Sequence, residues 1–346
     1  MADLESPLDT YVTPSEEALN AVYKNNFTAM CGVNIAHVVD TVRNILRLPK
    51  DAIPTTLRIL DHGSYNKLFL IQFGPTSLVA RVPFRHKPSA NDPIGIASQV
   101  STSQFLSIYR PKLPVPKILY AELNSANKAN VPFVLYELCN GTRLTWQKWS
   151  RTQTAAQKAN IVDLLAEKWA QLTEPVPFMA IGSILADASG HPPDYARDSR
   201  LRRLPTRPPA SSLALVHPDY ATTRNVLFST DRTHIEGIVD WDDAVVIPRD
   251  IAAMYPNELM TRAWWQVDPD LDDLLAIPPE TEQEKMRLTE IAVEETRLRQ
   301  RFRETVRRFD PQMRRSTQTL ERGSGAACTT LQTVGGRRGT DIWSTY

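Results

Sequence analysis

Short apolar segments alternate with turn residues along the first part of the chain. Residues 57–73 contain two runs of strand-forming residues around a short polar turn, and Gly74-Pro75 marks the next turn. Apolar positions in residues 94–109 recur at helical spacing. Further strands are predicted at residues 77–83, after Pro116 and at residues 133–138. The pattern therefore predicts a small antiparallel sheet with one inserted helix.

The pattern changes after Gly141, where longer helical periodicities replace the short strands. The predicted helix at residues 278–309 interleaves Glu with Arg, which is typical of a solvent-facing helix surface. The predicted segments are a helix at 15–47, a helix at 154–172, a long loop at 189–212, a helix at 250–265, a helix at 278–309 and a disordered tail at 314–346. The second half is thus expected to be mainly helical.

Composition removes several classes of function. The 346 residues carry a net charge of +1, which gives no electrostatic footprint for nucleic acid or an anionic membrane. Three widely spaced cysteines argue against a disulfide framework or a zinc site and favour a reducing compartment. The first eleven residues lack the apolar core of a signal peptide, and no run of about 20 apolar residues exists. We therefore expect a cytoplasmic protein; composition leaves the oligomeric state open.

The residues with the clearest chemistry lie between Leu215 and Asp250. Asp219 follows a buried apolar run, Asn225 opens the next, and Asp240 ends a third. Phosphoryl transfer requires a carboxylate that orients a hydroxyl, together with an Asn and a second carboxylate that hold Mg²⁺ on ATP. Each residue alone also has a plainer explanation, because Asp and Asn commonly cap turns and satisfy loop backbone groups. Asp242 and Asp243 are expected to be solvated or capping residues, with Asp242 as a possible support for the metal.

Together these motifs resemble the aminoglycoside phosphotransferase and choline kinase-like superfamily, especially its fungal members. The match is carried by His217-Pro-Asp219, Asn225-Val-Leu and Ile238-Val-Asp240-Trp. The resemblance continues upstream through Gly63-Ser64-Tyr-Asn66, Leu78-Val-Ala-Arg81, Pro114-Val-Pro116 and Pro132-Phe-Val-Leu-Tyr-Glu137. It implies an α+β protein with a bilobal protein kinase-like fold, in which a small antiparallel-sheet N-lobe precedes a mainly helical C-lobe.

The resemblance also implies domains and roles. The expected parts are a helical extension (1–50), a nucleotide-binding N-lobe (51–138), a C-lobe with the catalytic loop and metal site (139–310) and a tail (311–346). The implied roles are catalysis for Asp219, Mg²⁺ binding for Asn225 and Asp240, and ATP binding for Gly63, Ser64, Asn66, Arg81 and Glu137. His217 is expected to brace the catalytic loop. The activity implied is ATP-dependent phosphoryl transfer to a hydroxyl of a small molecule, without a nucleic-acid or membrane partner.

Three departures from the family pattern keep an alternative open. Six steps separate Asp219 from Asn225 where five are usual, so one extra residue must bulge between them. Gln99 stands where a Glu often pairs with the basic residue of the third strand, so Arg81 is expected to lack a bidentate carboxylate partner. Arg81 itself replaces the Lys of protein kinases. A further explanation of Arg81 is a strand residue that extends to solvent. The alternative function is a pseudokinase-like binding protein; a metal-dependent hydrolase is weaker, because no second His completes a metal set.

Overall fold

The computed structural model describes residues 34–62, 66–83, 93–145, 149, 152–178, 181–185, 212–249, 252, 255–256, 259 and 282–311. They fall into two compact units. The first comprises residues 1–140, 183–197 and 236–244, and the second comprises residues 141–182, 198–235 and 245–346. Most of the predicted helices at 15–47 and 250–265, the loop at 189–212 and the tail at 314–346 lie outside the described residues.

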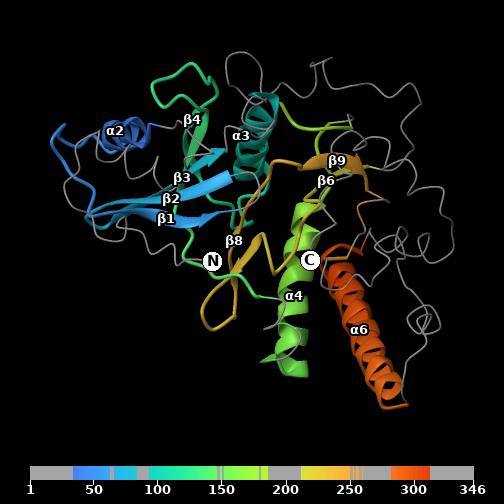
Figure 1. The fold of residues 1–346 in the computed structure, drawn as a ribbon. Coiled ribbons are helices and arrows are strands. Elements are labelled where there is room, and N and C mark those ends of the chain that lie inside the picture. The colour runs from blue at the N-terminus through green and yellow to red at the C-terminus, as the bar shows by residue number, and fades with distance from the viewer. Residues whose placement is uncertain are drawn as a thin grey trace. The chain divides into compact units, whose positions relative to one another are not determined.

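The first unit is built on a five-stranded antiparallel sheet (Figure 1). Its strand order is β1-β2-β3-β5-β4, so the late strand β5 pairs with β3 near the middle of the sheet. The turn between β2 and β3 contains Gly74 at φ 56°, a conformation that glycine adopts without a steric penalty. The five predicted strands are confirmed. They are β1 (Thr56–His62), β2 (Asn66–Phe73), β3 (Thr76–Pro83), β4 (Ile118–Glu122) and β5 (Phe133–Glu137).

Two helices accompany this sheet. Helix α2 (Ile35–Ile45) begins after Asn34, whose side chain accepts a hydrogen bond from the backbone N–H of His37 at 3.3 Å. Its apolar side chains join those of the sheet in one core, which includes Val38, Val39, Phe69, Leu78 and Leu135. Helix α3 (Pro93–Tyr109) begins at a proline, as its missing N–H allows, and confirms the inserted helix.

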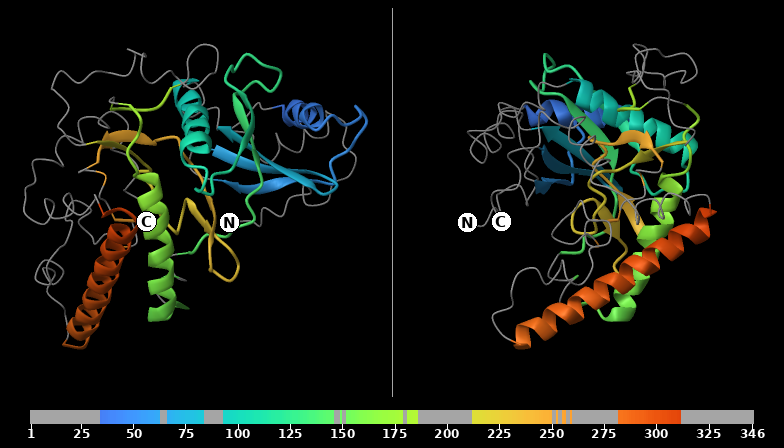
Figure 2. Two further views of the ribbon diagram at one scale, coloured as in Figure 1. Left: turned by 180° about the vertical axis from the view of Figure 1, so that it is seen from behind. Right: turned by 90° about the vertical axis from the view of Figure 1, so that its right-hand side faces the viewer.

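The second unit contains the long helices (Figure 2). Helix α4 (Ala155–Leu172) begins with a capping box, in which the Thr154 hydroxyl and the Gln157 side chain satisfy each other's backbone N–H groups. Helix α6 (Glu282–Phe309) crosses α4 and is joined to it by ion pairs of Lys158 with Glu294 and of Asp163 with Arg301. The short strands β6 (Leu213–Val216) and β9 (Val245–Pro248) pair antiparallel, and β7 (Val226–Phe228) also lies in this unit. Most of the next strand, β8 (Ile235–Ile238), belongs to the first unit.

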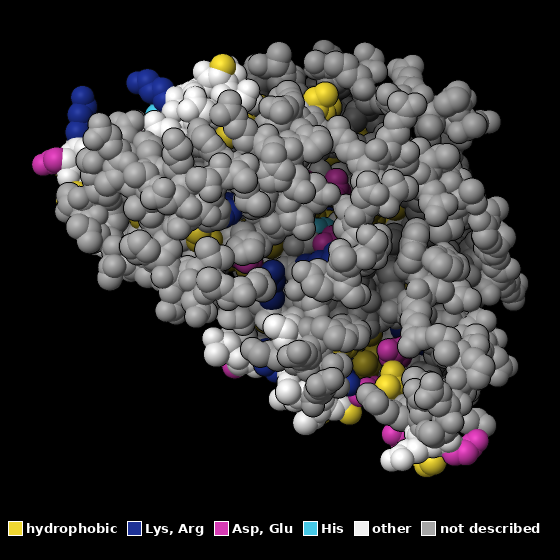
Figure 3. Space-filling model, in the orientation of Figure 1, with side chains coloured by type: hydrophobic (Ala, Val, Ile, Leu, Met, Phe, Trp, Pro, Cys, Tyr) yellow, Lys and Arg dark blue, Asp and Glu magenta, His cyan; other side chains and the backbone are white. Residues whose placement is uncertain are grey.

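The outer surface of α6 is mixed in character. Glu282 and Glu290 are exposed together with the apolar side chains of Met286, Ile291 and Val293. Figure 3 shows acidic and apolar side chains close together where α6 begins. Within the described part of the chain, no helix combines the length and apolar character needed to cross a membrane.

Candidate functional site

The sheet of the first unit positions Arg81. Arg81 lies on β3, between Leu68 of β2 and Val134 of β5 in the strand register. Its side chain is only 11 % exposed, so it does not extend to solvent, and that explanation of Arg81 is wrong. Tyr136 stands two residues from Val134 on β5 and therefore shares the face of Arg81.

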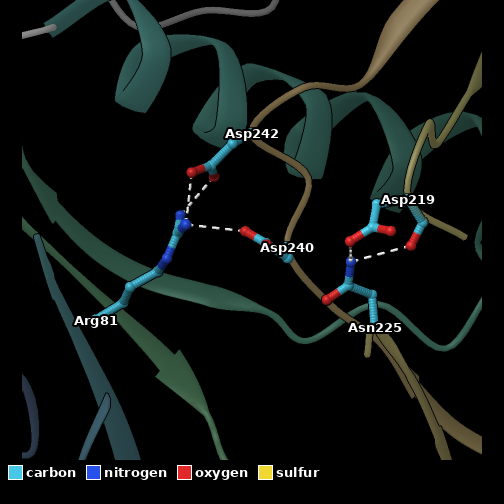
Figure 4. A network of polar contacts seen from close by, with 5 residues as sticks. All are labelled: Arg81, Asp219, Asn225, Asp240 and Asp242. Atoms are coloured by element: carbon cyan, nitrogen blue, oxygen red, sulfur yellow. Dashed lines mark hydrogen bonds and ion pairs between the residues drawn. The ribbon is translucent and has the colours of Figure 1, made fainter. Parts of the chain in front are cut away.

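A loop after β8 brings two carboxylates to this arginine (Figure 4). Arg81 Nη2 donates to Asp240 Oδ1 at 2.8 Å, and Nη1 and Nη2 donate to the two carboxylate oxygens of Asp242. The loop is anchored by buried Trp241, whose indole N–H donates to the Ile238 carbonyl at 2.8 Å. Arg81 thus makes a bidentate pair with Asp242 and a single bond with Asp240, the geometry that a guanidinium favours.

Asp240 has an unusual backbone conformation. Its φ of 67° lies in the left-handed region, where a non-glycine residue is uncommon. Such conformations cost on the order of 1 kcal/mol or more and cluster at functional sites. The Asp240 carboxylate is nevertheless 47 % exposed and is directed at Arg81. Directing this side chain at Arg81 therefore costs conformational free energy, as expected for a residue with a chemical role.

The electrostatic environment fixes the charge of this cluster. Burial lowers the pKa of the Arg81 guanidinium, but the charges of Asp242 and Asp240 outweigh that effect and the net pKa is raised. Burial also raises the pKa of the Tyr136 phenol, which the charge of Arg81 opposes and the two carboxylates reinforce. Arg81 therefore stays charged and Tyr136 stays neutral at ordinary pH.

A second polar group lies in the second unit, on the loop after β6. Asn225 Nδ2 donates to Asp219 Oδ2 and to the Asp219 carbonyl, both at 3.0 Å. Because both acceptors are oxygens without hydrogens, the amide must present its NH₂ to them, and its oxygen points away (Figure 4). Arg224 Nη1 lies 3.2 Å from Asp219 Oδ1 in a largely exposed ion pair. Asp219 is thus held by its own loop.

The same loop shows how six steps fit between Asp219 and Asn225. The Ala221 carbonyl accepts from the backbone N–H groups of Arg224, Asn225 and Val226, which closes a turn over the intervening residues. Tyr220 anchors the start of this turn, since its hydroxyl donates to the Leu165 carbonyl of α4 at 3.1 Å. The extra residue is therefore absorbed in the turn.

His217 lies just before this loop and is buried. Its carbonyl accepts from the Tyr220 backbone N–H at 3.2 Å. This contact is backbone to backbone, so it does not test the expected bracing role of the imidazole.

The remaining predicted site residues are only partly described. Gly63 and Ser64 lie outside the described residues. Asn66 begins β2 and pairs with Pro83. Glu137 ends β5 with an exposed side chain, and its backbone N–H donates to the Lys117 carbonyl at 3.0 Å. Their nucleotide-binding roles stay predictions, as does the convergence of Asp219, Asn225 and Asp240 on one cation.

Two expectations are corrected. Asp242 was expected to be a solvated or capping residue, but its carboxylate binds both terminal nitrogens of Arg81. Arg81 was expected to lack a bidentate carboxylate because Gln99 replaces a Glu, and that inference is also wrong. Strand alternation could not have found Asp242, because Asp240 has a left-handed backbone conformation and Asp242 lies in the turn that follows it.

Comparison with known proteins identifies the family. The model of the phosphotransferase enzyme family, APH, matches residues 56–276. The chain belongs to the phosphotransferase enzyme family. The match includes β1 through β9 and therefore both polar groups described above. The predicted aminoglycoside phosphotransferase-like family and α+β, protein kinase-like fold are confirmed.

Solved structures with detectable similarity to this phosphotransferase-family protein include aminoglycoside phosphotransferases. A GDP complex of a mutant of aminoglycoside 2'-phosphotransferase-IIIa is 15% identical, with a TM-score of 0.41 and coverage of 87% of this chain and 99% of that chain. A complex of a thermostable mutant of APH(4)-Ia with AMP-PNP and hygromycin B is 12% identical, with a TM-score of 0.41 and coverage of 77% and 98%. No curated protein sequence matches the chain.

Proposed function

We propose that this protein is an ATP-dependent phosphotransferase that transfers a phosphoryl group to a hydroxyl of a small molecule. The family match over residues 56–276 carries the proposal, because that range includes Arg81, Asp219, Asn225 and Asp240. Family membership by itself supports phosphotransferase chemistry on small molecules. The choice of ATP, the hydroxyl acceptor and a cytoplasmic location belong to the proposal.

In this proposal Asp219 is the catalytic carboxylate. Its side chain is part-exposed, at 38 %, and accepts hydrogen bonds from Asn225 and Arg224, so it is oriented while it can still accept a proton from an acceptor hydroxyl. Most of the rate enhancement would come from positioning and charge neutralisation, as is usual for phosphoryl transfer.

The donor atoms suit Mg²⁺. The carboxylate of Asp240 and the amide oxygen of Asn225 are the hard oxygen ligands that this ion prefers. Among the described residues no cluster of three or more His, Cys, Asp or Glu could hold a metal by itself. In the proposal the ion would be held by one carboxylate, one amide oxygen, water and nucleotide phosphates. When bound, the ion would neutralise charge on the transferring phosphoryl group.

Arg81 is the proposed contact to the nucleotide phosphates. Its guanidinium is buried in the sheet and keeps its charge, which makes it a fixed positive group. Gly63, Ser64, Asn66 and Glu137 are proposed to complete nucleotide binding through the segment before β2 and the end of β5.

A binding assay tests the proposal without knowledge of the acceptor. Thermal unfolding is followed with Mg²⁺ plus ATP or GTP, for the parent chain, Asp240→Ala and the matched control Asp243→Ala, whose parent side chain is exposed in the same loop. Ligand at 100 times its Kd stabilises a folded protein by about 2.7 kcal/mol, a shift of several degrees. We expect this shift in the parent and the control and its loss in Asp240→Ala. An equal shift in Asp240→Ala would show that Asp240 is not a metal ligand.

Turnover separates the enzyme from the pseudokinase alternative. ADP release is measured across a panel of small hydroxyl compounds, with Asp219→Asn as the control. Acceptor-dependent ADP release that disappears in Asp219→Asn supports the phosphotransferase. Nucleotide binding without ADP release from any member of a broad panel favours the binding protein.

A further inference from the structure

Arg81 divides its contacts unequally between two carboxylates. Asp242 accepts hydrogen bonds from both Nη1 and Nη2, whereas Asp240 accepts from Nη2 alone. A planar guanidinium is oriented by a two-point carboxylate contact and not by a single bond. The contact with Asp242 therefore suffices to hold Arg81 in its present direction, and the contact with Asp240 is an addition to it.

Helix α3 does not supply the two-point contact that orients Arg81. The side chain of Gln99 is 3 % exposed, and its amide oxygen has no hydrogen-bond partner in the structure. The buried hydroxyl of neighbouring Ser98 likewise has no hydrogen-bond partner in the structure. Because no acidic residue occurs between Pro93 and Tyr109, the helix cannot supply a carboxylate to Arg81 from any position. The loop that contains Asp240 and Asp242 is the source of both partners.

We propose that Asp242 is a positioning residue that keeps Arg81 in place while Asp240 exchanges the guanidinium for a divalent cation. The inference rests on the proposed function and deepens it. Arg81 and the two carboxylates together carry a net charge of −1, so the group as a whole attracts a cation that binds Asp240. Arg81, still held at two points by Asp242, would then keep its charge directed at the nucleotide phosphates.

The proposal differs from a direct role for Asp242 as a metal ligand. If Asp242 acts through Arg81, its removal has little effect once Arg81 itself is gone. If Asp242 binds the metal directly, its removal weakens binding to the same extent whether or not Arg81 is present. A double-mutant cycle separates these cases, because it measures the coupling between two side chains.

The cycle uses the dissociation constant of Mg²⁺-ATP, measured by calorimetry on the full chain. The variants are Asp242→Asn, Arg81→Met and the double variant, with Asp243→Asn as a control that removes the same charge one residue away. We expect about 10-fold weaker binding in each single variant and no further loss in the double variant relative to Arg81→Met. Asp243→Asn should stay within about twofold of the parent.

The outcomes are distinct. Losses that multiply in the double variant overturn the positioning role of Asp242. A parent chain that binds no Mg²⁺-nucleotide overturns the proposed function, and this inference with it. Folding is checked by circular dichroism; Asp240 and Asp242 are 47 % and 36 % exposed, so both remain solvated without Arg81.

A second measurement uses Mn²⁺ alone, followed by the paramagnetic resonance signal of the free ion. Because Arg81 occupies Asp240 in the absence of nucleotide, Arg81→Met should bind Mn²⁺ more tightly than the parent, although it binds the nucleotide complex less tightly. We expect at least a roughly threefold gain, since one opposing charge is removed beside the carboxylate. Equal or weaker binding of Mn²⁺ to Arg81→Met would refute the exchange at Asp240.

Discussion

The buried ion pair between Arg249 and Asp310 offers a sharp test of how the second unit is held together. Arg249 follows β9 and Asp310 follows α6, and their side chains are 7 % and 8 % exposed. Arg249 Nε also donates to the Thr173 carbonyl, just after α4, at 3.1 Å. The perturbation is removal of one partner, by Arg249→Met or by Asp310→Leu, and then of both.

The expected magnitude follows from burial. Removing one member of a buried pair leaves an uncompensated charge and lowers the free energy of unfolding by about 3–5 kcal/mol. Arg249→Met also removes the bond to Thr173, which adds about 1 kcal/mol. The double variant leaves no buried charge, so it should be more stable than either single variant by at least about 2 kcal/mol. For a unit of this size, a loss of about 4 kcal/mol lowers Tm by roughly 10 °C.

The assay is urea unfolding followed by far-ultraviolet circular dichroism, with Tm as a second measure. The exposed pair of Asp163 and Arg301, which joins α4 to α6, is the matched control. Arg301 Nε and Nη2 lie 2.9 and 2.6 Å from the carboxylate oxygens, so this pair is also bidentate. Because Arg301 is 49 % exposed, Arg301→Met should cost less than about 1 kcal/mol.

Three results would refute this reasoning. Losses below about 1 kcal/mol in both single variants would mean that water reaches the pair. Additive losses in the double variant would mean that the two charges do not compensate each other. A loss in Arg301→Met equal to that of Arg249→Met would mean that burial does not decide the strength of the contact.

Three further predictions concern single positions. Burial raises the pKa of the Cys139 thiol to about 11, and the charges of Glu236 and Glu137 add to the effect. At pH 8 the Cys139 thiol should therefore react with iodoacetamide about 100-fold more slowly than in the unfolded chain, and its rate should rise about tenfold for each further pH unit. Thr154→Ala removes the capping box of α4 and should lower the free energy of unfolding by about 1 kcal/mol. Asp240→Gly should be more stable than Asp240→Ala by about 1 kcal/mol in thermal unfolding, since glycine accepts the positive φ.

Each has its own control. Peptide mapping by mass spectrometry isolates Cys139 from the other two cysteines, and fast labelling at pH 8 would contradict its burial. Thr154→Ser retains the capping hydroxyl and should stay close to the parent. Equal stabilities of the Gly and Ala variants at position 240 would mean that the backbone relaxes out of the left-handed region once the carboxylate is gone.

Local sequence was sufficient for the five strands of the first unit and for helices α4 and α6. Each of the five strands is a short apolar run between turn residues such as Gly74, and α4 and α6 carry apolar residues at helical spacing. These are properties of neighbouring residues, so they can be read from the chain itself. Local pattern also selected Asp219, Asn225 and Asp240, because each lies next to a buried strand, and the family match over residues 56–276 includes all three.

The partners of Arg81 were not available from local sequence. Asp240 and Asp242 lie 159 and 161 positions from Arg81, and any of several acidic residues could have met it. The missing Glu at position 99 suggested an arginine without a bidentate carboxylate, whereas the loop after β8 supplies one. The order of neighbouring residues determined strands, helices and the candidate chemistry of this protein. Only the tertiary structure decided which charges meet, because an ion pair depends on distance in space, and chain folding sets that distance independently of sequence separation.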